Sequence, residues 1–211
     1  YYGSHALYNR HCIDDTSKMK MHNEKIVIFV HGRNGHPNDF IPLIENIKAT
    51  DYSLLTVNLG ETAETHLDED VEKLKKELTL YPECQIILVG LSKGGLTIMR
   101  YITTVDDSRI KKGITISSPL QGTNLALLLP PNTTTHNELG YKSEITQQIA
   151  TTKITIPIFH IVPKLDHMII PVEAAKYDNT DESHIYYYEG YYGHMGITHS
   201  IEVADVISGW L

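Results

Sequence analysis

The sequence predicts an α/β fold: a mostly parallel, doubly wound sheet with helices on both faces. Short apolar runs alternate along the chain with segments whose apolar residues recur at helical spacing. Continuous apolar runs such as 26–30 and 85–91 are typical of parallel strands buried on both faces. The length of 211 residues suits one sizeable core. We therefore expect a single domain over residues 1–211, built from alternating strands and helices.

The first expected strand and helix lie near the start of this alternation. The apolar run at 26–30 is the strand, and Gly32 follows its end. The segment NDFIPLIENI comes next and has apolar residues at helical spacing. Asn38 or Asp39 is the expected N-cap of this helix, because short polar side chains can accept hydrogen bonds from the first free N–H groups.

A second strand and the clearest helix follow. The strand is SLLTVNL, at 53–59, and the helix is HLDEDVEKLKKELTLYP, at 66–82. Its leucines and its valine form one apolar stripe. Asp68, Glu69 and Asp70 stand at the start and lysines come later, which is the charge order that the helix dipole favours.

The remaining elements resume this order after one interruption. Residues 120–151 break the alternation, and we expect them to form a short lid or pocket insertion with a helix near 139–150; ordinary core is the alternative for its LALLLPP segment. Residues 1–23 are weakly patterned, and the sequence assigns them no element. The other expected elements are strands at 85–91, 110–118, 154–162 and 183–188, and helices at 96–105, 171–177 and 199–211.

Composition excludes several classes of partner. The formal net charge of -8 argues against nucleic acid and against general attraction to anionic membranes. No apolar run approaches the roughly 20 residues that a membrane span needs, and no segment of the chain resembles a signal peptide. Cys12 and Cys84 are too few for a disulfide framework, and they either pair or remain free thiols. Neither compartment nor oligomeric state follows from these numbers.

The segment Gly90-Leu91-Ser92-Lys93-Gly94 follows a buried strand and opens a helix. It fits G-x-S-x-G, in which a sharp turn lifts the serine hydroxyl clear of the sheet. Small residues are needed there because a side chain would collide with the strand or the helix. The adjoining helix N-terminus favours developing negative charge. Ser92 is therefore either a nucleophile or an ordinary helix N-cap.

A nucleophilic serine needs a base, and the base needs an orienting acid. On a parallel sheet of this kind the chain order is serine, acid, histidine. Asp166 follows the strand at 154–162, and a turn residue is the alternative reading. His194 lies in a glycine-flanked loop after the last strand, whereas His199 lies at the start of the final helix. We expect Asp166 as the acid and His194 as the base, with His199 as a cap or surface residue.

The oxyanion of an acyl-transfer reaction needs two backbone N–H donors. One is expected from Lys93, the residue after the serine. The other is expected from Arg33, in the HGRNG loop after the first strand; a plain glycine turn is the alternative.

Taken together, these motifs resemble the α/β-hydrolase superfamily, and within it the bacterial triacylglycerol lipase and esterase group. The resemblance covers residues 25–211. It consists of VHGRNG for the oxyanion loop, GLSKGG for the nucleophile elbow (GHSxGG in the family), SSPLQGTNLA for TPHxGSxLA, GYKSEITQQI for SxFLxxL, LDHMIIP for the acid loop and GHMGITHS for GHxGLLxS.

The resemblance implies an α/β-hydrolase fold with Ser92 as nucleophile, Asp166 as acid and His194 as base, and with Arg33 and Lys93 as backbone oxyanion donors. The chain departs from the family at Leu91, where histidine is usual, and at Lys93, where methionine or glutamine is common. Leu91 does no chemistry, and every triad position is filled.

The expected function is hydrolysis of acyl or lipid esters by a serine hydrolase through an acyl-enzyme intermediate. The alternatives are an acyl-protein or acyl-CoA thioesterase and a non-catalytic binding module with the same fold. We expect a small-molecule acyl ester or lipid as substrate, no nucleic acid, and at most transient membrane contact. No cofactor is expected, because no phosphate-binding glycine motif occurs, and no metal, because the histidine spacings do not align two ligands on one helix face.

The two cationic side chains beside the expected oxyanion site suggest a hypothesis about selectivity. If the Arg33 guanidinium and the Lys93 ammonium face the substrate, esters with an anionic group are favoured. In the alternative both side chains are solvated and only their N–H groups matter, as is usual for surface lysine and arginine.

Overall fold

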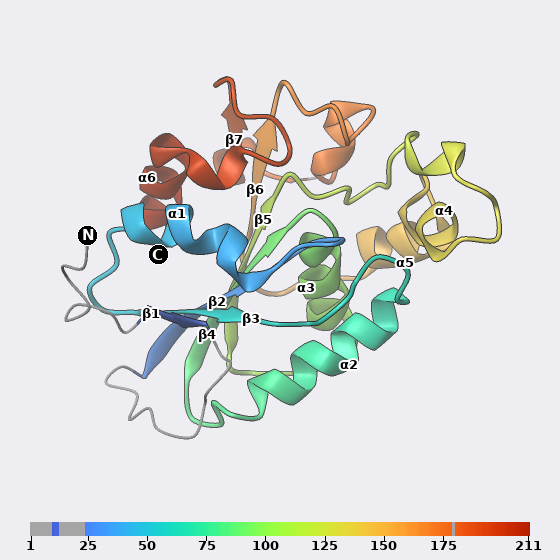
Figure 1. Ribbon diagram of the computed structural model, residues 1–211. Helices are drawn as coiled ribbons and strands as arrows, with labels where there is room; N and C mark the ends of the chain where they lie inside the picture. Colours follow the sequence, from blue (N-terminus) through green and yellow to red (C-terminus); the bar gives the residue numbers. More distant parts are fainter. Residues whose placement is uncertain (1–9, 13–23, 179) are drawn as a thin grey trace.

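A seven-stranded sheet, in which every neighbouring pair of strands is parallel, forms the centre of the molecule (Figure 1). The structure, a computed structural model, describes residues 10–12, 24–178 and 180–211. The strand order is β1-β3-β2-β4-β5-β6-β7. The predicted α/β class is confirmed, and the sheet is wholly parallel over the described residues.

The strands are β1 (Arg10–Cys12), β2 (Lys25–Val30), β3 (Ser53–Val57), β4 (Gln85–Leu91), β5 (Ile110–Ile116), β6 (Ile158–Pro163) and β7 (Ile185–Tyr188). The α-helices are α1 (Ile41–Asn46), α2 (Leu67–Leu78), α3 (Lys93–Thr104), α4 (Thr134–Leu139), α5 (Glu144–Thr151) and α6 (Ile201–Trp210). Short 3-10 turns are η2 (Pro37–Phe40), η3 (Ala126–Leu128), η4 (Val172–Ala175), η5 (Glu182–His184) and η6 (Ile197–His199).

The apolar strand runs are continuous because each face of the sheet is covered by helices. Along β2, Ile26, Ile28 and Val30 belong to the core cluster that also contains residues of α2 and α3. The alternate residues Val27 and Phe29 belong to a second cluster with residues of α1 and α6. The two helix pairs lie on opposite sides of the sheet in Figure 1. Both faces of β2 are buried, so apolar residues do not alternate with polar ones along this strand.

Three local features differ from the sequence prediction. Arg10–Cys12, within the stretch that had no assigned element, pairs with β3; residues 1–9 and 13–23 lie outside the described part. The turn before α1 is capped by His36, whose ring accepts from the Asn38 N–H, rather than by Asn38 or Asp39. The insertion holds two helices, α4 and α5, instead of one.

The LALLLPP segment of the insertion is divided between surface and core. Leu127, Leu128 and Leu129 are exposed, whereas Ala126 is buried in the core that α3 shares with the insertion. Ordinary core is therefore the wrong interpretation for these three leucines. Cys84 is a buried free thiol. Among the helices of the described residues, none combines the length and the hydrophobicity that crossing a membrane requires.

His160 is a buried polar residue on β6, between β5 and β7. Its Nδ1 lies 2.8 Å from the Thr115 hydroxyl of the neighbouring strand. Burial, with smaller contributions from the nearby His184 and Lys176, lowers the pKa of His160 from 6.5 to about 3. Between about pH 6.5 and pH 3, His160 is therefore protonated in the unfolded chain and neutral in the folded chain.

We predict that His160 makes the protein less stable in acid. Its contribution is complete above pH 6.5 and is lost as pH falls toward 3, with a slope of up to about 1.36 kcal/mol per pH unit. Denaturant unfolding of His160→Gln between pH 7 and 4 should show a flatter dependence than the parent. His66→Gln is the control of opposite sign, because the hydrogen bond that its ring donates to the Glu138 carboxylate raises the pKa of His66. Parallel curves for the parent and His160→Gln would contradict the prediction.

Candidate active site

Ser92 stands on a sharp turn between β4 and α3. Its backbone has φ 54° and ψ -124°, a left-handed conformation that is rare and strained for a residue with a side chain. Its side chain makes no cap hydrogen bond to the helix. The ordinary N-cap interpretation is therefore wrong, and the hydroxyl is free for another partner.

Close packing around the turn explains its glycines. A Cβ on Gly90 would lie 2.4 Å from the carbonyl oxygen of Gly94, and one on Gly94 would lie 2.2 Å from that of Val30. One on Gly95 would lie 1.8 Å from the hydroxyl oxygen of Ser118, in the SSPLQGTNLA segment. The glycines let strand, helix and neighbouring loops approach closely enough to hold the strained serine.

Three loops at the carboxyl edge of the sheet bring the serine, a histidine and an aspartate into one chain of contacts. His194 Nε2 lies 2.8 Å from Ser92 Oγ. His194 Nδ1 lies 2.9 Å from one carboxylate oxygen of Asp166 and 3.2 Å from the other. Because a carboxylate only accepts, this network assigns the ring proton to Nδ1 and leaves Nε2 to accept from the serine.

The carboxylate of Asp166 is fixed by its own loop. One oxygen accepts hydrogen bonds from the N–H groups of Met168 and Ile169, at 2.8 Å and 3.1 Å. Asp166 is 8% exposed and His194 5%, so little water competes for either. Thr123 of the insertion holds the loop from outside, since its hydroxyl donates to the Met168 carbonyl and accepts from the Ile170 N–H.

His199 lies away from this arrangement. It is exposed, belongs to η6, and its ring lies 6.3 Å from that of Tyr192. The structure thus places His194, and not His199, beside Ser92.

The loop after β2 lies directly against the serine. A Cβ on Gly32 would be 2.9 Å from Ser92 Cβ and 3.4 Å from the Lys93 nitrogen. Within the described residues, the backbone N–H groups of Arg33 and Lys93 donate no intrachain hydrogen bond. Both are free to bind an anionic oxygen.

Solved structures with the same architecture are esterases, lipases and related hydrolases. A lipase-esterase related protein from Clostridium acetobutylicum matches with a TM-score of 0.63 and 15% identity over 90% of this chain and 96% of its own. Est1E from Butyrivibrio proteoclasticus matches with a TM-score of 0.66 and 15% identity, over 90% of this chain and 88% of its own. An extracellular α/β-hydrolase from a Paenibacillus species matches with a TM-score of 0.60 and 14% identity, over 87% of this chain and 98% of its own. This chain has the α/β-hydrolase fold. No protein-family model matches the sequence, and no curated protein does either.

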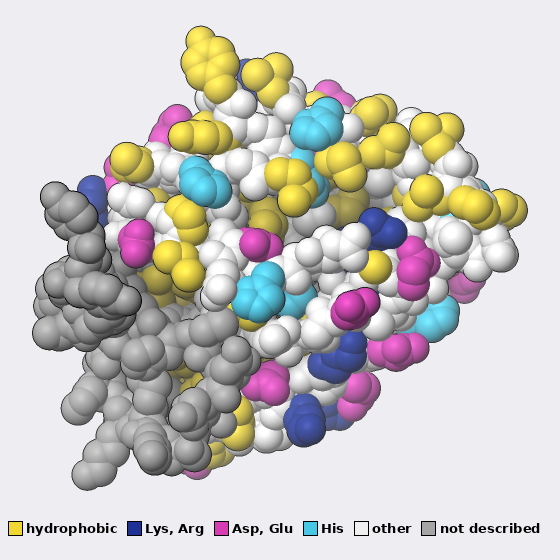
Figure 2. Space-filling model, in the orientation of Figure 1, with side chains coloured by type: hydrophobic (Ala, Val, Ile, Leu, Met, Phe, Trp, Pro, Cys, Tyr) yellow, Lys and Arg dark blue, Asp and Glu magenta, His cyan; other side chains and the backbone are white. Residues whose placement is uncertain are grey.

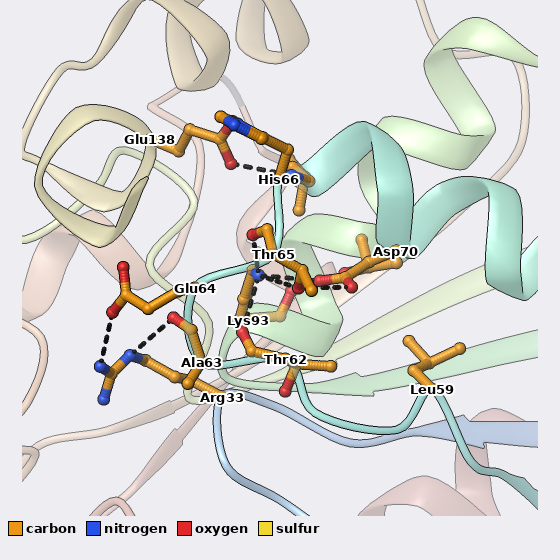
Figure 3. A network of polar contacts seen from close by, with 12 residues as sticks. Arg33, Leu59, Thr62, Ala63, Glu64, Thr65, His66, Asp70, Lys93 and Glu138 are labelled. Carbon is orange, nitrogen blue, oxygen red and sulfur yellow. Dashed lines mark hydrogen bonds and ion pairs between the residues drawn. The ribbon is translucent and has the colours of Figure 1, made fainter. Parts of the chain in front are cut away.

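On this α/β-hydrolase fold, both cations beside the serine turn are paired with carboxylates (Figure 3). The Lys93 side chain is 4% exposed and its ammonium lies 2.8 Å from Asp70. The Arg33 guanidinium lies 3.0 Å from Glu64 and also donates to the Ala63 carbonyl. The Lys93 ammonium is thus neither solvated nor directed at a substrate. Both alternatives of the selectivity hypothesis, a substrate-facing and a solvated ammonium, are wrong for this residue.

Hydrophobic side chains gather along the edge of the α/β-hydrolase fold that carries the insertion and the loops after β6 and β7 (Figure 2). These loops also hold Asp166 and His194, so the apolar edge adjoins the serine. Its exposed members are Leu127, Leu128, Leu129, Leu165, Met168, Ile170, Tyr191, Tyr192 and Met195. In the described ranges, His, Cys, Asp and Glu side chains form no group of three that could hold a metal ion.

We predict that the reactivity of Ser92 depends on His194 and Asp166 and not on His199. Labelling by a fluorophosphonate should slow by several orders of magnitude in His194→Ala, because no base remains to accept the serine proton. Asp166→Asn should also be slow, since the amide favours the wrong tautomer of the ring. His199→Ala is the matched control and should label like the parent. Fast labelling of His194→Ala together with loss in His199→Ala would reverse the assignment.

Proposed function

We propose that the protein is a serine ester hydrolase with Ser92 as nucleophile, His194 as general base and acid, and Asp166 as the orienting carboxylate. One observation carries the proposal: the serine, imidazole and carboxylate contact one another in order at hydrogen-bond distances. The free N–H groups of Arg33 and Lys93 support it, as do the esterase and lipase structures of the same fold.

In the acylation step the Ser92 hydroxyl gives its proton to His194 Nε2 as Oγ bonds to the ester carbonyl carbon. The carbonyl oxygen becomes an oxyanion, which the N–H groups of Arg33 and Lys93 stabilise. The oxyanion then collapses, the carbon–alkoxy bond breaks, and the leaving alcohol takes the proton from His194. The product is an acyl ester on Ser92.

Deacylation repeats these steps with water as the nucleophile. His194 takes a proton from water as the oxygen attacks the acyl carbon, and it returns that proton to Ser92 Oγ as the carboxylic acid leaves. The Asp166 carboxylate stabilises the imidazolium that forms in each half-reaction. Each cycle therefore consumes one ester and one water and restores the starting enzyme.

The surroundings of the serine favour neutral esters with apolar acyl groups. Arg33, Lys93 and Lys164 lie next to the elements that carry the site, and each is paired: Arg33 with Glu64, Lys93 with Asp70 and Lys164 with Glu189. The neighbouring exposed edge is apolar. An acyl-CoA carries several phosphate charges that would need unpaired cations, so this substrate fits the site less well than a plain acyl ester.

Ser92→Ala should abolish ester hydrolysis without unfolding the protein. Loss of a triad nucleophile costs on the order of 10⁶ in kcat. The measurement is turnover of a p-nitrophenyl ester series of increasing chain length, with circular dichroism to check folding. Ser108→Ala, in a loop at the opposite edge of the sheet, is the matched control. A parent that turns over no ester and whose Ser92 takes up no fluorophosphonate would instead be a binding module.

The pairing of Arg33 with Glu64 predicts weak selectivity for charge. Arg33→Met keeps the backbone N–H and removes the charge. It should change the ratio of kcat/KM for matched neutral and anionic esters by less than about fivefold, because an exposed, paired charge contributes little. Lys48→Met, in the exposed pair with Asp205, is the control. A tenfold or larger change would mean that the guanidinium leaves Glu64 to bind the substrate.

A further inference from the structure

The Lys93 ammonium is bound on several sides by one loop and one helix (Figure 3). It lies 2.8 Å from Asp70 Oδ2 in the first turn of α2. It donates to the carbonyl oxygens of Thr62 and Thr65, at 2.9 Å and 2.7 Å, and lies 3.2 Å from the Thr65 hydroxyl. That hydroxyl in turn donates to the other oxygen of Asp70.

We propose that Lys93 and Asp70 are positioning residues for the oxyanion site: their ion pair holds the loop at 59–65 as a brace between the two backbone segments that supply its N–H donors. This inference rests on the proposed function, because it assigns those two N–H groups to the oxyanion.

The loop at 59–65 also contacts the segment before Arg33, the second proposed donor, through two further hydrogen bonds. The Thr62 hydroxyl donates to the Gly32 carbonyl, at 2.7 Å. The Leu59 N–H donates to His31 Nε2, at 3.1 Å, and His31 Nδ1 lies 3.0 Å from the Gly32 carbonyl. Burial lowers the pKa of His31, so its neutral ring can accept from Leu59 and donate to Gly32.

These contacts couple the two proposed donors through a single element. The Lys93 N–H is one donor, and the Lys93 ammonium holds the loop at 59–65. That loop holds His31 and Gly32, and the next residue is Arg33, whose N–H is the other donor. A methionine or glutamine at position 93 would keep the first donor, but it would remove the nearer cation from Asp70, which is 1% exposed and lies 3.5 Å from Lys73.

A purely stabilising ion pair is the competing explanation, and the two make different predictions. Replacing a whole buried pair by apolar residues of similar volume is often neutral for stability, whereas removing one partner is costly. A stabilising role therefore predicts that the double replacement restores both folding and activity. A positioning role predicts that folding recovers while activity does not, since the brace is still missing.

The test is a double-mutant cycle of Lys93→Met, Asp70→Leu and the combined variant. Both single variants should melt lower than the parent, and the combined variant should recover much of that loss. In all three, kcat for a p-nitrophenyl ester should fall about 10- to 100-fold, as expected for donors displaced by a fraction of an ångström to an ångström. KM should stay within about threefold, and affinity for a boronic acid that mimics the tetrahedral intermediate should fall in parallel with kcat.

Arg109→Met is the matched control, because Arg109 pairs with Asp107 at the amino-terminal end of β5, on the far edge of the sheet. It should lower the melting temperature and leave kcat unchanged. A combined Lys93→Met/Asp70→Leu variant with parental kcat would overturn the proposal, and so would an equal loss of kcat in Arg109→Met.

Amide hydrogen exchange separates this inference from the proposed function. The combined variant should exchange faster than the parent over residues 31–35 and 59–65, and Arg109→Met should not. If the parent neither hydrolyses esters nor reacts at Ser92, the proposed function fails, and the exchange result still decides whether the pair braces the loop. Unchanged exchange over 31–35 would overturn the coupling directly.

Discussion

Backbone packs against backbone at the Ser92 turn, and the rest of the site depends on that contact. The carbonyl of Val30 lies where any side chain on Gly94 would have to go. This approach fixes the distance between the end of β2 and the start of α3, which sets the loop after β2 beside the serine. It also holds Ser92 at its positive φ, a conformation that persists only where the surroundings enforce it.

The parallel sheet supplies the second constraint. All strands run the same way, so the loops after β2, β4, β6 and β7 open on one edge. Asp166 and His194 come from different loops and still meet, because the register of β6 against β7 places their ends side by side. The Asp166 loop is held locally by two N–H groups of its own segment and by Thr123 of the insertion.

Charge around the serine is balanced inside the protein rather than left for a ligand. Asp70 and Glu64 pair with Lys93 and Arg33, so the two N–H groups and the apolar edge are what the proposed ester substrate would meet. The loop at 59–65 contacts the insertion, since the Thr135 hydroxyl on α4 donates to the Ala63 carbonyl. At the start of α2, Glu138 on α4 contacts His66 and accepts from the Leu67 N–H. Hydrogen bonds therefore link α4 of the insertion both to the loop at 59–65 and to the Arg33 side chain.

The sequence by itself determined strands β2 to β7, the serine turn and the order of Ser92, Asp166 and His194 along the chain. Buried strands and turns that contain glycine leave patterns in the local sequence. The sequence missed β1, which is three residues long and has too little pattern to show. It also missed the partner of Lys93. Asp70 falls three residues after Leu67 on the apolar stripe of α2, a signal of burial, yet its position at the helix start suggested only a dipole effect. Only the packing of α2 against α3 decided that this carboxylate meets the lysine, since a contact between residues 23 positions apart depends on how two helices dock and not on either segment alone.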